Sequence, residues 1–207
     1  MGKVAGRTDW KDGFLFVGNE LVLDFVNTRP VQDRKPMELL KDFGAVLRWF
    51  QAAEQLRPGE VASLERQWGG TATAQKTTEA MWVLREKLRT EILSWEHDGA
   101  IRGSTLGDLN ILLADHPMRT KLKASGSAHF AELWFEVREP EDLFAPLAHS
   151  AAVLFTKADR KRVRKCAQCV LHFRDTSKKG ARRWCSMRLC GNRLKVAAYA
   201  ARQRRHR

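Results

Sequence analysis

Four cysteines are the residues of this chain whose type and spacing most clearly predict chemistry. Cys166 and Cys169 form a C-x2-C pair, and after fifteen further residues Cys185 and Cys190 form a C-x4-C pair. Two close pairs separated by a loop that can fold back suit a tetrahedral zinc ion, because each pair supplies two thiolates from one turn. The second gap is four residues instead of the commoner two. The spacing therefore predicts one zinc ion held by these four cysteines.

Other uses of the thiols stay open from the sequence: a redox pair, metal-free thiols, another metal or a disulfide. A thioredoxin-like pair at Cys166 and Cys169 would need a strand followed by a helix, whereas a highly basic connector precedes Cys166. The opening residues MGKVAGRTDWKDG contain no apolar leader, so we expect a cytoplasmic protein, in which disulfides are disfavoured. Four thiolates would fill the tetrahedron, so the expected zinc is structural and not catalytic.

The positive charge of the chain is concentrated around these cysteines. The 207 residues carry 37 Lys and Arg against 24 Asp and Glu, a net charge of +13. Residues 157–207 hold 18 of the basic residues and two of the acidic ones, which leaves +16 there and −3 in residues 1–156. Such an asymmetry favours a polyanionic partner for the basic part. We expect this partner to be nucleic acid, with DNA ahead of RNA.

The rest of the chain has the patterns of a mostly helical domain with a few strands. Alternation in the run from Phe14 to Pro30 predicts an extended segment that turns at Gly18 and Asn19. Helical spacing of apolar residues predicts helices over 39–50, 61–68, 81–95 and 106–113, and a last helix that begins at Pro140. Residues 69–75 are expected to form a loop, and Thr105 with Asp108 a capping box.

A change of period to two predicts a β-hairpin over 119–124 and 130–137 that turns at 125–127. We place the domain boundary near Thr156. The expected fold class is α+β, with a helical N-terminal domain over 1–156 and a small basic zinc-binding domain over 157–207. No apolar run approaches the roughly 20 residues of a membrane span, so no membrane contact is expected.

The residues around the second cysteine pair resemble a known family. WCSMRLCGNR at 184–193 is similar to the signature of the CGNR zinc-finger family, and the similarity extends through FRDTSKKGARR before it and LKVAAYAARQR after it. LVLDFVNTRP at 21–30 resembles the start of the ABATE domain, which accompanies this finger. The resemblance implies a regulatory α+β domain, a treble-clef-like finger with the same four zinc ligands, and a stress-induced transcription regulator. His172 stands where a Trp-containing apolar stretch is expected.

A helix from about Ser186 onward, with Ser186 as its N-cap, would carry a polar stripe on the side away from the metal. Its cations could bind phosphate or guanine and its asparagine could read adenine; the alternative is a plain solvated face. The stripe contains Arg188, Asn192, Lys195, Tyr199 and Arg202. Arg182 and Arg183 are further phosphate candidates. We interpret Trp184, Asp175 and Arg193 as structural residues near the metal, with Arg193 paired to Asp175 or to backbone carbonyls.

Asn27 and Thr28 close the first extended segment. They could line a ligand pocket, although we favour a role in satisfying backbone groups of the turn. No nucleophile–base pair, phosphate-binding glycine loop or acid pair stands out in the sequence, so we do not expect an enzyme. Two functions remain. One is a transcription regulator whose first domain senses a small-molecule effector or forms a homodimer while the zinc segment binds DNA; the other is an RNA- or ribosome-associated zinc protein.

Overall fold

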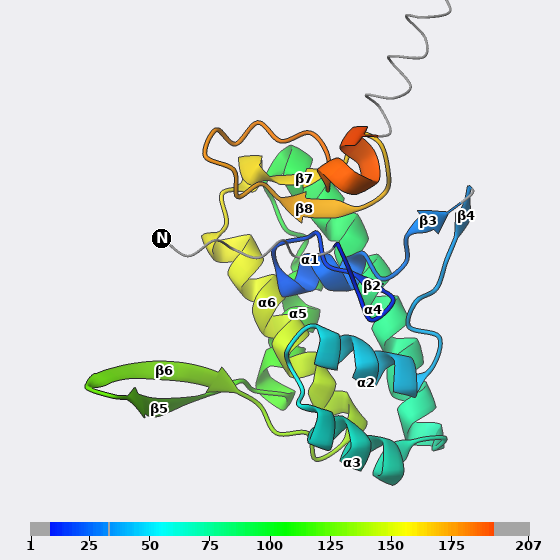
Figure 1. Cartoon of the computed structure of the whole chain (residues 1–207), viewed down its shortest axis with the longest axis vertical. Coiled ribbons are helices and arrows are strands. Elements are labelled where there is room, and N and C mark those ends of the chain that lie inside the picture. The colour runs from blue at the N-terminus through cyan, green and yellow to red at the C-terminus, as the bar shows by residue number, and fades with distance from the viewer. Residues whose placement is uncertain (1–8, 33, 193–207) are drawn as a thin grey trace, which may run out of the picture.

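The computed structural model describes residues 9–32 and 34–192 (Figure 1). Helices pack into an elongated body, and the cysteine-containing segment lies across one end of it. Four separate two-stranded antiparallel pairs accompany the helices among the described residues. The expected α+β class, mostly helical with a few antiparallel strands and a small C-terminal finger, is confirmed.

The first segment differs from its prediction. Only β1 (Trp10–Lys11) and β2 (Phe14–Leu15) are strands, and α1 (Leu21–Val26) is a helix where the alternation predicted extended chain. Five of the six residues of α1 are buried, Asp24 among them. A short helix that is buried on nearly every side shows no apolar stripe at the helical period, so its pattern cannot be told from that of a strand.

The next helices begin where side chains cap them. The carboxylate of Asp42 accepts a hydrogen bond from the N–H of Ala45 (2.7 Å), so α2 (Phe43–Ala52) begins four residues later than predicted. Pro58 occupies the first turn of α3 (Pro58–Trp68). The hydroxyl of Thr71 caps α4 (Ala72–Asp98), which shortens the expected loop over 69–75.

The last two long helices complete the body. Arg102 precedes α5 (Gly103–Asp115), and Thr105, predicted in the cap, lies inside the helix. Its hydroxyl donates instead to the buried carboxylate of Glu91 (2.6 Å). The 3₁₀ turn η1 (Pro140–Leu143) leads into α6 (Phe144–Lys157), whose inner face is fully buried. The core contains Trp49 and Phe25 at 0% exposure, so aromatic packing fills its centre.

The remaining strands of the described chain form three antiparallel pairs. β3 (Val31–Gln32) pairs with β4 (Lys35–Pro36), and β5 (Arg119–Ser125) pairs with β6 (Ala128–Trp134) as predicted. After the 3₁₀ turn η2 (Arg160–Arg162), β7 (Val163–Lys165) pairs with β8 (His172–Arg174). Within the described part of the chain, no helix is long and apolar enough to cross a membrane.

Candidate metal centre and nucleic-acid surface

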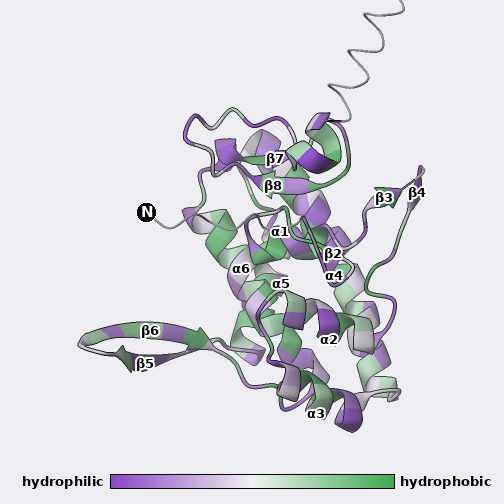
Figure 2. Ribbon diagram, viewed as in Figure 1, coloured by the Kyte–Doolittle hydropathy of each residue, from purple (hydrophilic) through white to green (hydrophobic). Residues whose placement is uncertain are grey.

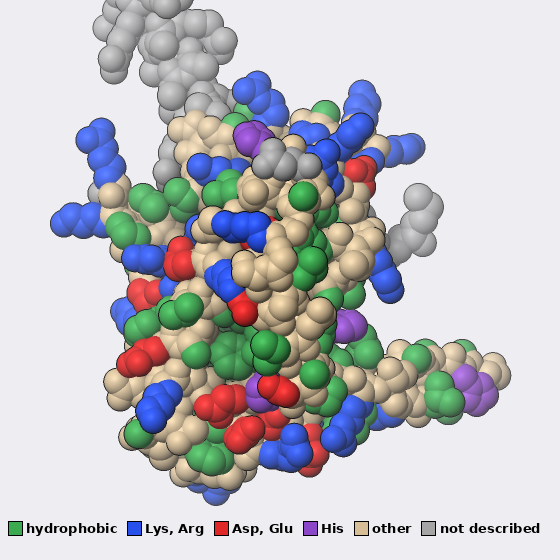
Figure 3. Space-filling model, turned by 180° about the vertical axis from the view of Figure 1, so that it is seen from behind, with side chains coloured by type: hydrophobic (Ala, Val, Ile, Leu, Met, Phe, Trp, Pro, Cys, Tyr) green, Lys and Arg blue, Asp and Glu red, His purple; other side chains and the backbone are tan. Residues whose placement is uncertain are grey.

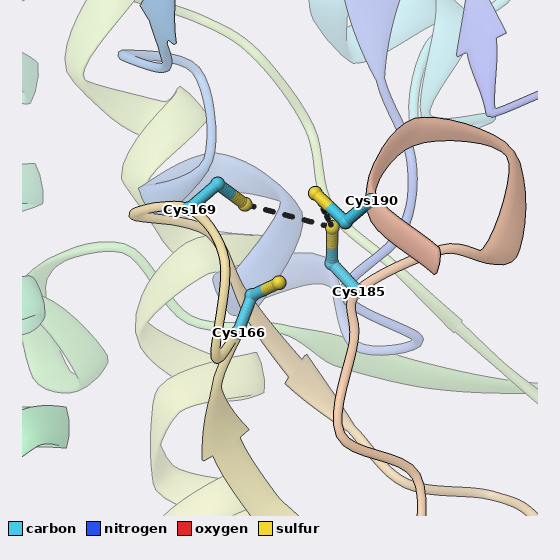
Figure 4. A group of neighbouring side chains, drawn as sticks. All are labelled: Cys166, Cys169, Cys185 and Cys190. Atoms are coloured by element: carbon cyan, nitrogen blue, oxygen red, sulfur yellow. Dashed lines mark hydrogen bonds between the residues drawn. The ribbon is translucent and has the colours of Figure 1, made fainter. Parts of the chain in front are cut away.

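Four sulfur atoms converge on one point between two segments of the chain (Figure 4). The Sγ atoms of Cys166, Cys169, Cys185 and Cys190 all lie within 4.8 Å of one another. Cys185 Sγ is 3.7 Å from Cys169 Sγ and 3.7 Å from Cys190 Sγ. A tetrahedral zinc ion with Zn–S bonds of about 2.3 Å separates its sulfur ligands by about 3.8 Å. The donor set and its spacing fit one structural zinc ion.

The four thiols influence one another's ionisation. Hydrogen bonds from Cys169 and Cys185 lower the pKa of Cys166, whereas hydrogen bonds to Cys166 and Cys169 raise the pKa of Cys185. Burial, together with the nearby charge of Cys169, raises the pKa of Cys190 to about 12. Four thiolates so close together repel one another. A divalent cation offsets that repulsion, which couples metal binding to folding.

The first cysteine pair lies in the connection between two paired strands. Cys166 follows β7 directly, and its N–H donates to the carbonyl of Leu171 (2.8 Å) just before β8. The register Val163↔Arg174 to Lys165↔His172 holds the ends of this connection together. Cys166 and Cys169 therefore present both sulfur atoms from one tight turn.

The second pair flanks and enters a π-helical turn, η3 (Met187–Gly191): Cys185 lies just before its N-cap, and Cys190 lies within the turn. Ser186 is its N-cap, as predicted, and accepts from the N–H groups of Arg188 (3.0 Å) and Leu189 (3.4 Å). The N–H of Gly191 donates to the carbonyl of Ser186 (3.1 Å), a wider turn than that of an α-helix. This wide turn brings Cys190 back toward Cys185 and accounts for the unusual C-x4-C spacing.

The metal centre shares its small core with the start of the chain. Leu15 and Val17 pack with the buried cysteines and with Leu171 and Phe173. Leu15 is 4% exposed and Val17 3% exposed. Sequence reasoning missed both residues as part of the metal centre, because their apolar character gives no sign of a partner about 150 residues away along the chain.

Two family models match the chain. One, described as "putative stress-induced transcription regulator" and named ABATE, matches residues 19–158, which is more than half of the chain. The other, the CGNR zinc finger, matches residues 162–203. The chain belongs to the ABATE family. Neither description is that of an enzyme. No curated protein matches the chain.

Asn27 of the ABATE domain holds the outer edge of β8 in the CGNR finger. Its side-chain Nδ2 donates to the carbonyl of His172 (2.8 Å), and its Oδ1 accepts from the N–H of His172 (2.8 Å). The amide thus pairs with both backbone groups of one residue, as a neighbouring strand would. Asn27 is 0% exposed. Its hydrogen-bonding groups therefore serve the contact between domain and finger.

Further contacts extend this interface along β8. The N–H of Arg174 donates to the carbonyl of Gly18 (2.8 Å), and Asn19 Nδ2 donates to the carbonyl of Arg174 (2.8 Å). Arg174 also forms an ion pair with Glu20. A Cβ on Gly18 would lie 2.7 Å from Leu23 Cβ, so only glycine fits this turn. The sequence predicted the turn at Gly18 and Asn19 but not its contact with β8.

The side chain of Thr28 forms its hydrogen bonds inside the ABATE domain. Its hydroxyl donates to the carbonyl of Phe25 (2.7 Å) and accepts from Arg85 Nη1 (2.9 Å). The Arg85 guanidinium, 1% exposed, forms a two-point ion pair with Glu38. Thr28 thus bonds a backbone carbonyl of its own turn and helps to satisfy a buried arginine, whereas Asn27 bonds His172 of the finger instead of its own turn.

Asp175 organises the loop between the two cysteine pairs. Its carboxylate accepts from the N–H groups of Ser177 (2.9 Å) and Arg182 (2.8 Å). Burial alone would raise the pKa of Asp175, but these hydrogen bonds lower it to about 2. The Arg182 side chain lies over the Phe173 ring at 4.8 Å and donates to the carbonyl of Trp184 (2.7 Å). Trp184, half-buried, packs against the finger core, and Arg193 lies outside the described residues.

His172 is buried in the finger next to this loop. It is 1% exposed, and burial together with the charges of Arg89 and Lys165 lowers its pKa to about 4. Among the described residues, no group forms a hydrogen bond with either of its ring nitrogens. The imidazole therefore packs as a neutral ring at the place where the family resemblance leads one to expect an apolar stretch.

The nucleic-acid candidates fall into two groups. Arg183, Arg188 and Asn192 are exposed, and the Arg183 guanidinium lies 5.9 Å from the centre of the Trp184 ring. Arg182 is half-buried and already bonded within the finger. Lys195, Tyr199 and Arg202 lie outside the described residues. The described exposed members all come from the segment that carries the second cysteine pair.

Proposed function

We propose that this protein is a zinc-dependent DNA-binding transcription regulator. The ABATE domain, assigned to residues 1–156, would respond to a signal, and the finger, assigned to residues 157–207, would contact DNA. The observation that carries this proposal is the placement of the net charge. The finger segment has a charge of +16, which one zinc ion and four thiolates reduce to +14, while the remainder has −3. A polyanion is the partner that such a segment attracts most strongly.

A basic hollow beside the metal centre offers a place for phosphate groups. It has a volume of about 420 Å³ and lies where the end of α4 meets β7. One acidic residue, Glu96, lines it together with His97 and six basic residues: Arg160, Lys161, Arg164, Lys165, Arg182 and Arg183. Arg160 and Arg164 already donate to backbone carbonyls, which fixes their guanidinium groups at the wall. The exposed side chains of Lys161, Lys165 and Arg183 add charge that can reach a ligand. Figure 3 shows Lys and Arg side chains gathered at this end of the molecule.

The second contact we propose is the polar stripe that begins at η3. Exposed Arg188 would bind phosphate, and exposed Asn192 would read a base edge in the major groove. Lys195, Tyr199 and Arg202 would continue the same stripe. Phosphate contacts at the hollow would fix the register of the finger, and the stripe would supply sequence preference.

Binding of the zinc-loaded full chain to duplex DNA and to structured RNA tests this function. With six or more phosphate contacts, affinity should fall by about 10³-fold or more between 50 and 200 mM salt. Arg188→Ala should weaken DNA binding and reduce the salt slope by about 1. Arg66→Ala, which removes an exposed arginine of the ABATE domain, is the matched control and should leave binding unchanged.

Selection of bound sequences from random DNA and RNA pools separates the two nucleic acids. Preference for a short duplex sequence supports the regulator. Equal or tighter binding to structured RNA would instead indicate the RNA- or ribosome-associated alternative, and the absence of salt-sensitive affinity for either would refute both. The same proposal places the protein in the cytoplasm without enzymatic activity, and it gives the ABATE domain an effector-sensing or self-association role.

A further inference from the structure

A β-hairpin arm, defined here as residues 119–134, projects from the helical body (Figure 1). β5 and β6 pair from Arg119↔Trp134 to Ser125↔Ala128, and Gly126 at φ +60° makes the turn. Every residue of the two strands is exposed or half-buried. A hairpin that extends beyond its own core must find stability elsewhere, because an isolated two-stranded pair is marginal in water.

Strand alternation divides the arm into two unlike faces, and hydrophobic and hydrophilic residues alternate along it in Figure 2. One of them, the apolar face, consists of the cross-strand pairs Thr120↔Leu133, Leu122↔Ala131 and Ala124↔His129. It contains no Lys, Arg, Asp or Glu. Leu122 is 80% exposed and Leu133 is 49% exposed, so no part of the described chain covers this face fully.

The opposite face satisfies its own charges. Glu132 forms ion pairs with Lys121 (3.1 Å) and Lys123 (2.8 Å). The cationic groups of Arg119 and Lys121 lie over the Trp134 ring at 5.6 and 5.2 Å. The charged side chains of this face thus have partners within the arm and can remain exposed to solvent. This face also carries Phe130, which is 46% exposed and lies opposite Lys123. The two faces differ in charge, because only the face of Leu122 and Leu133 lacks Lys, Arg, Asp and Glu.

We propose that the apolar face binds the same face of a second copy of this chain. Each of its central pairs joins a larger side chain to a smaller one: Leu122 lies opposite Ala131, and Leu133 opposite Thr120. A copy turned about a two-fold axis can place its Leu122 over Ala131, so the two faces interdigitate. No charged side chain opposes another across such a contact, because the apolar face carries none.

A nucleic acid is a poorer occupant of the arm. It would bind the cationic face, where Lys121 and Lys123 already pair with Glu132, and it would leave Leu122 and Leu133 in water. Figure 3 shows hydrophobic side chains along the projecting arm. Burial of these side chains against a copy of themselves removes apolar area from water, which is the main favourable contribution to association.

Light scattering on a sizing column tests this contact with the zinc-loaded full chain, freed of nucleic acid by nuclease and high salt. The wild-type protein should have the mass of two 23.7 kDa chains. Leu122→Glu should have the mass of one chain at the same concentration, because it places two new carboxylates, one from each chain, in or beside the apolar contact. Val83→Glu is the matched control: Val83 on α4 is 71% exposed, and this change should leave the dimer intact.

Hydrogen exchange supplies a second readout. Amides of β5 and β6 should exchange more slowly as the wild-type concentration rises, and those of Leu122→Glu should not change with concentration. A wild-type monomer, a Leu122→Glu dimer, or equal dissociation by Val83→Glu would overturn the contact. Unchanged mass with loss of DNA binding in Leu122→Glu would also overturn it and would assign the arm to nucleic acid instead. If the wild-type chain forms the dimer but does not bind DNA, the proposed function fails and the dimer contact is still supported.

Discussion

Replacing Asn27 by alanine measures how strongly the CGNR finger is held on the ABATE domain. The substitution removes two buried hydrogen bonds of 2.8 Å to His172 and leaves the N–H and carbonyl of β8 without partners. Each bond contributes about 1 kcal/mol net, and each unsatisfied buried group costs about 1–3 kcal/mol. We expect the free energy of unfolding to fall by about 2–5 kcal/mol.

Asn19→Gly is the control, because it removes a single hydrogen bond to the same strand, and that bond is exposed to solvent. Glycine also accepts the φ of +60° found at Asn19. This change should cost only about 0.5–1.5 kcal/mol. Urea unfolding of both zinc-saturated variants, with zinc content measured on each sample, gives the comparison. Faster amide exchange at His172 in Asn27→Ala would show that the loss of stability arises at β8. Equal losses in the two variants would show that Asn27 does not anchor the finger.

Three further predictions concern the metal, pH and chain geometry. Elemental analysis should find one zinc per chain, and Cys190→Ser or a chelator should remove protection from the amides of β7 and β8; full protection without metal would contradict the zinc assignment. Burial lowers the pKa of His172 from 6.5 to about 4, so the unfolded state binds the proton more readily, and stability present above pH 6.5 should be lost as pH falls toward 4. The difference in unfolding free energy between wild type and His172→Leu should change by about 3 kcal/mol over that window, and a constant difference would rule out the buried neutral ring. Gly18→Ala should destabilise by about 1–3 kcal/mol in thermal unfolding, because its Cβ would lie 2.7 Å from Leu23 Cβ; an unchanged midpoint would show that the turn can relax.

The sequence predicted the features whose causes are local. Apolar residues at spacings of three and four located α4 and α6, and Gly126 between alternating runs located the β5–β6 hairpin. The cysteine spacing predicted the four thiols that the structure brings within 4.8 Å. Each of these signals lies within one element or one turn, so it can be read without knowing the tertiary fold.

Features that depend on distant partners could not be read in this way. The sequence of α1 predicts extended chain, because burial on nearly all sides removes the helical period. Asn27 meets its partner His172 across 145 residues, and its type alone allowed either a turn or a pocket. The C-x4-C spacing was visible, but the π-helical turn that explains it appears only with the hydrogen bond from Gly191 to Ser186. Lys195, Tyr199 and Arg202 lie outside the described residues, so their stripe stays a prediction.

The packing of Leu15 and Val17 against the cysteine cluster has a consequence for protein engineering. A fusion that carries only residues 160–207 would omit both side chains and leave Phe173 and the sulfur ligands open to solvent on one side. We therefore expect the finger not to fold when it is transferred alone. A transplant to another scaffold would have to bring residues 9–18 with it, or supply two apolar side chains in their place.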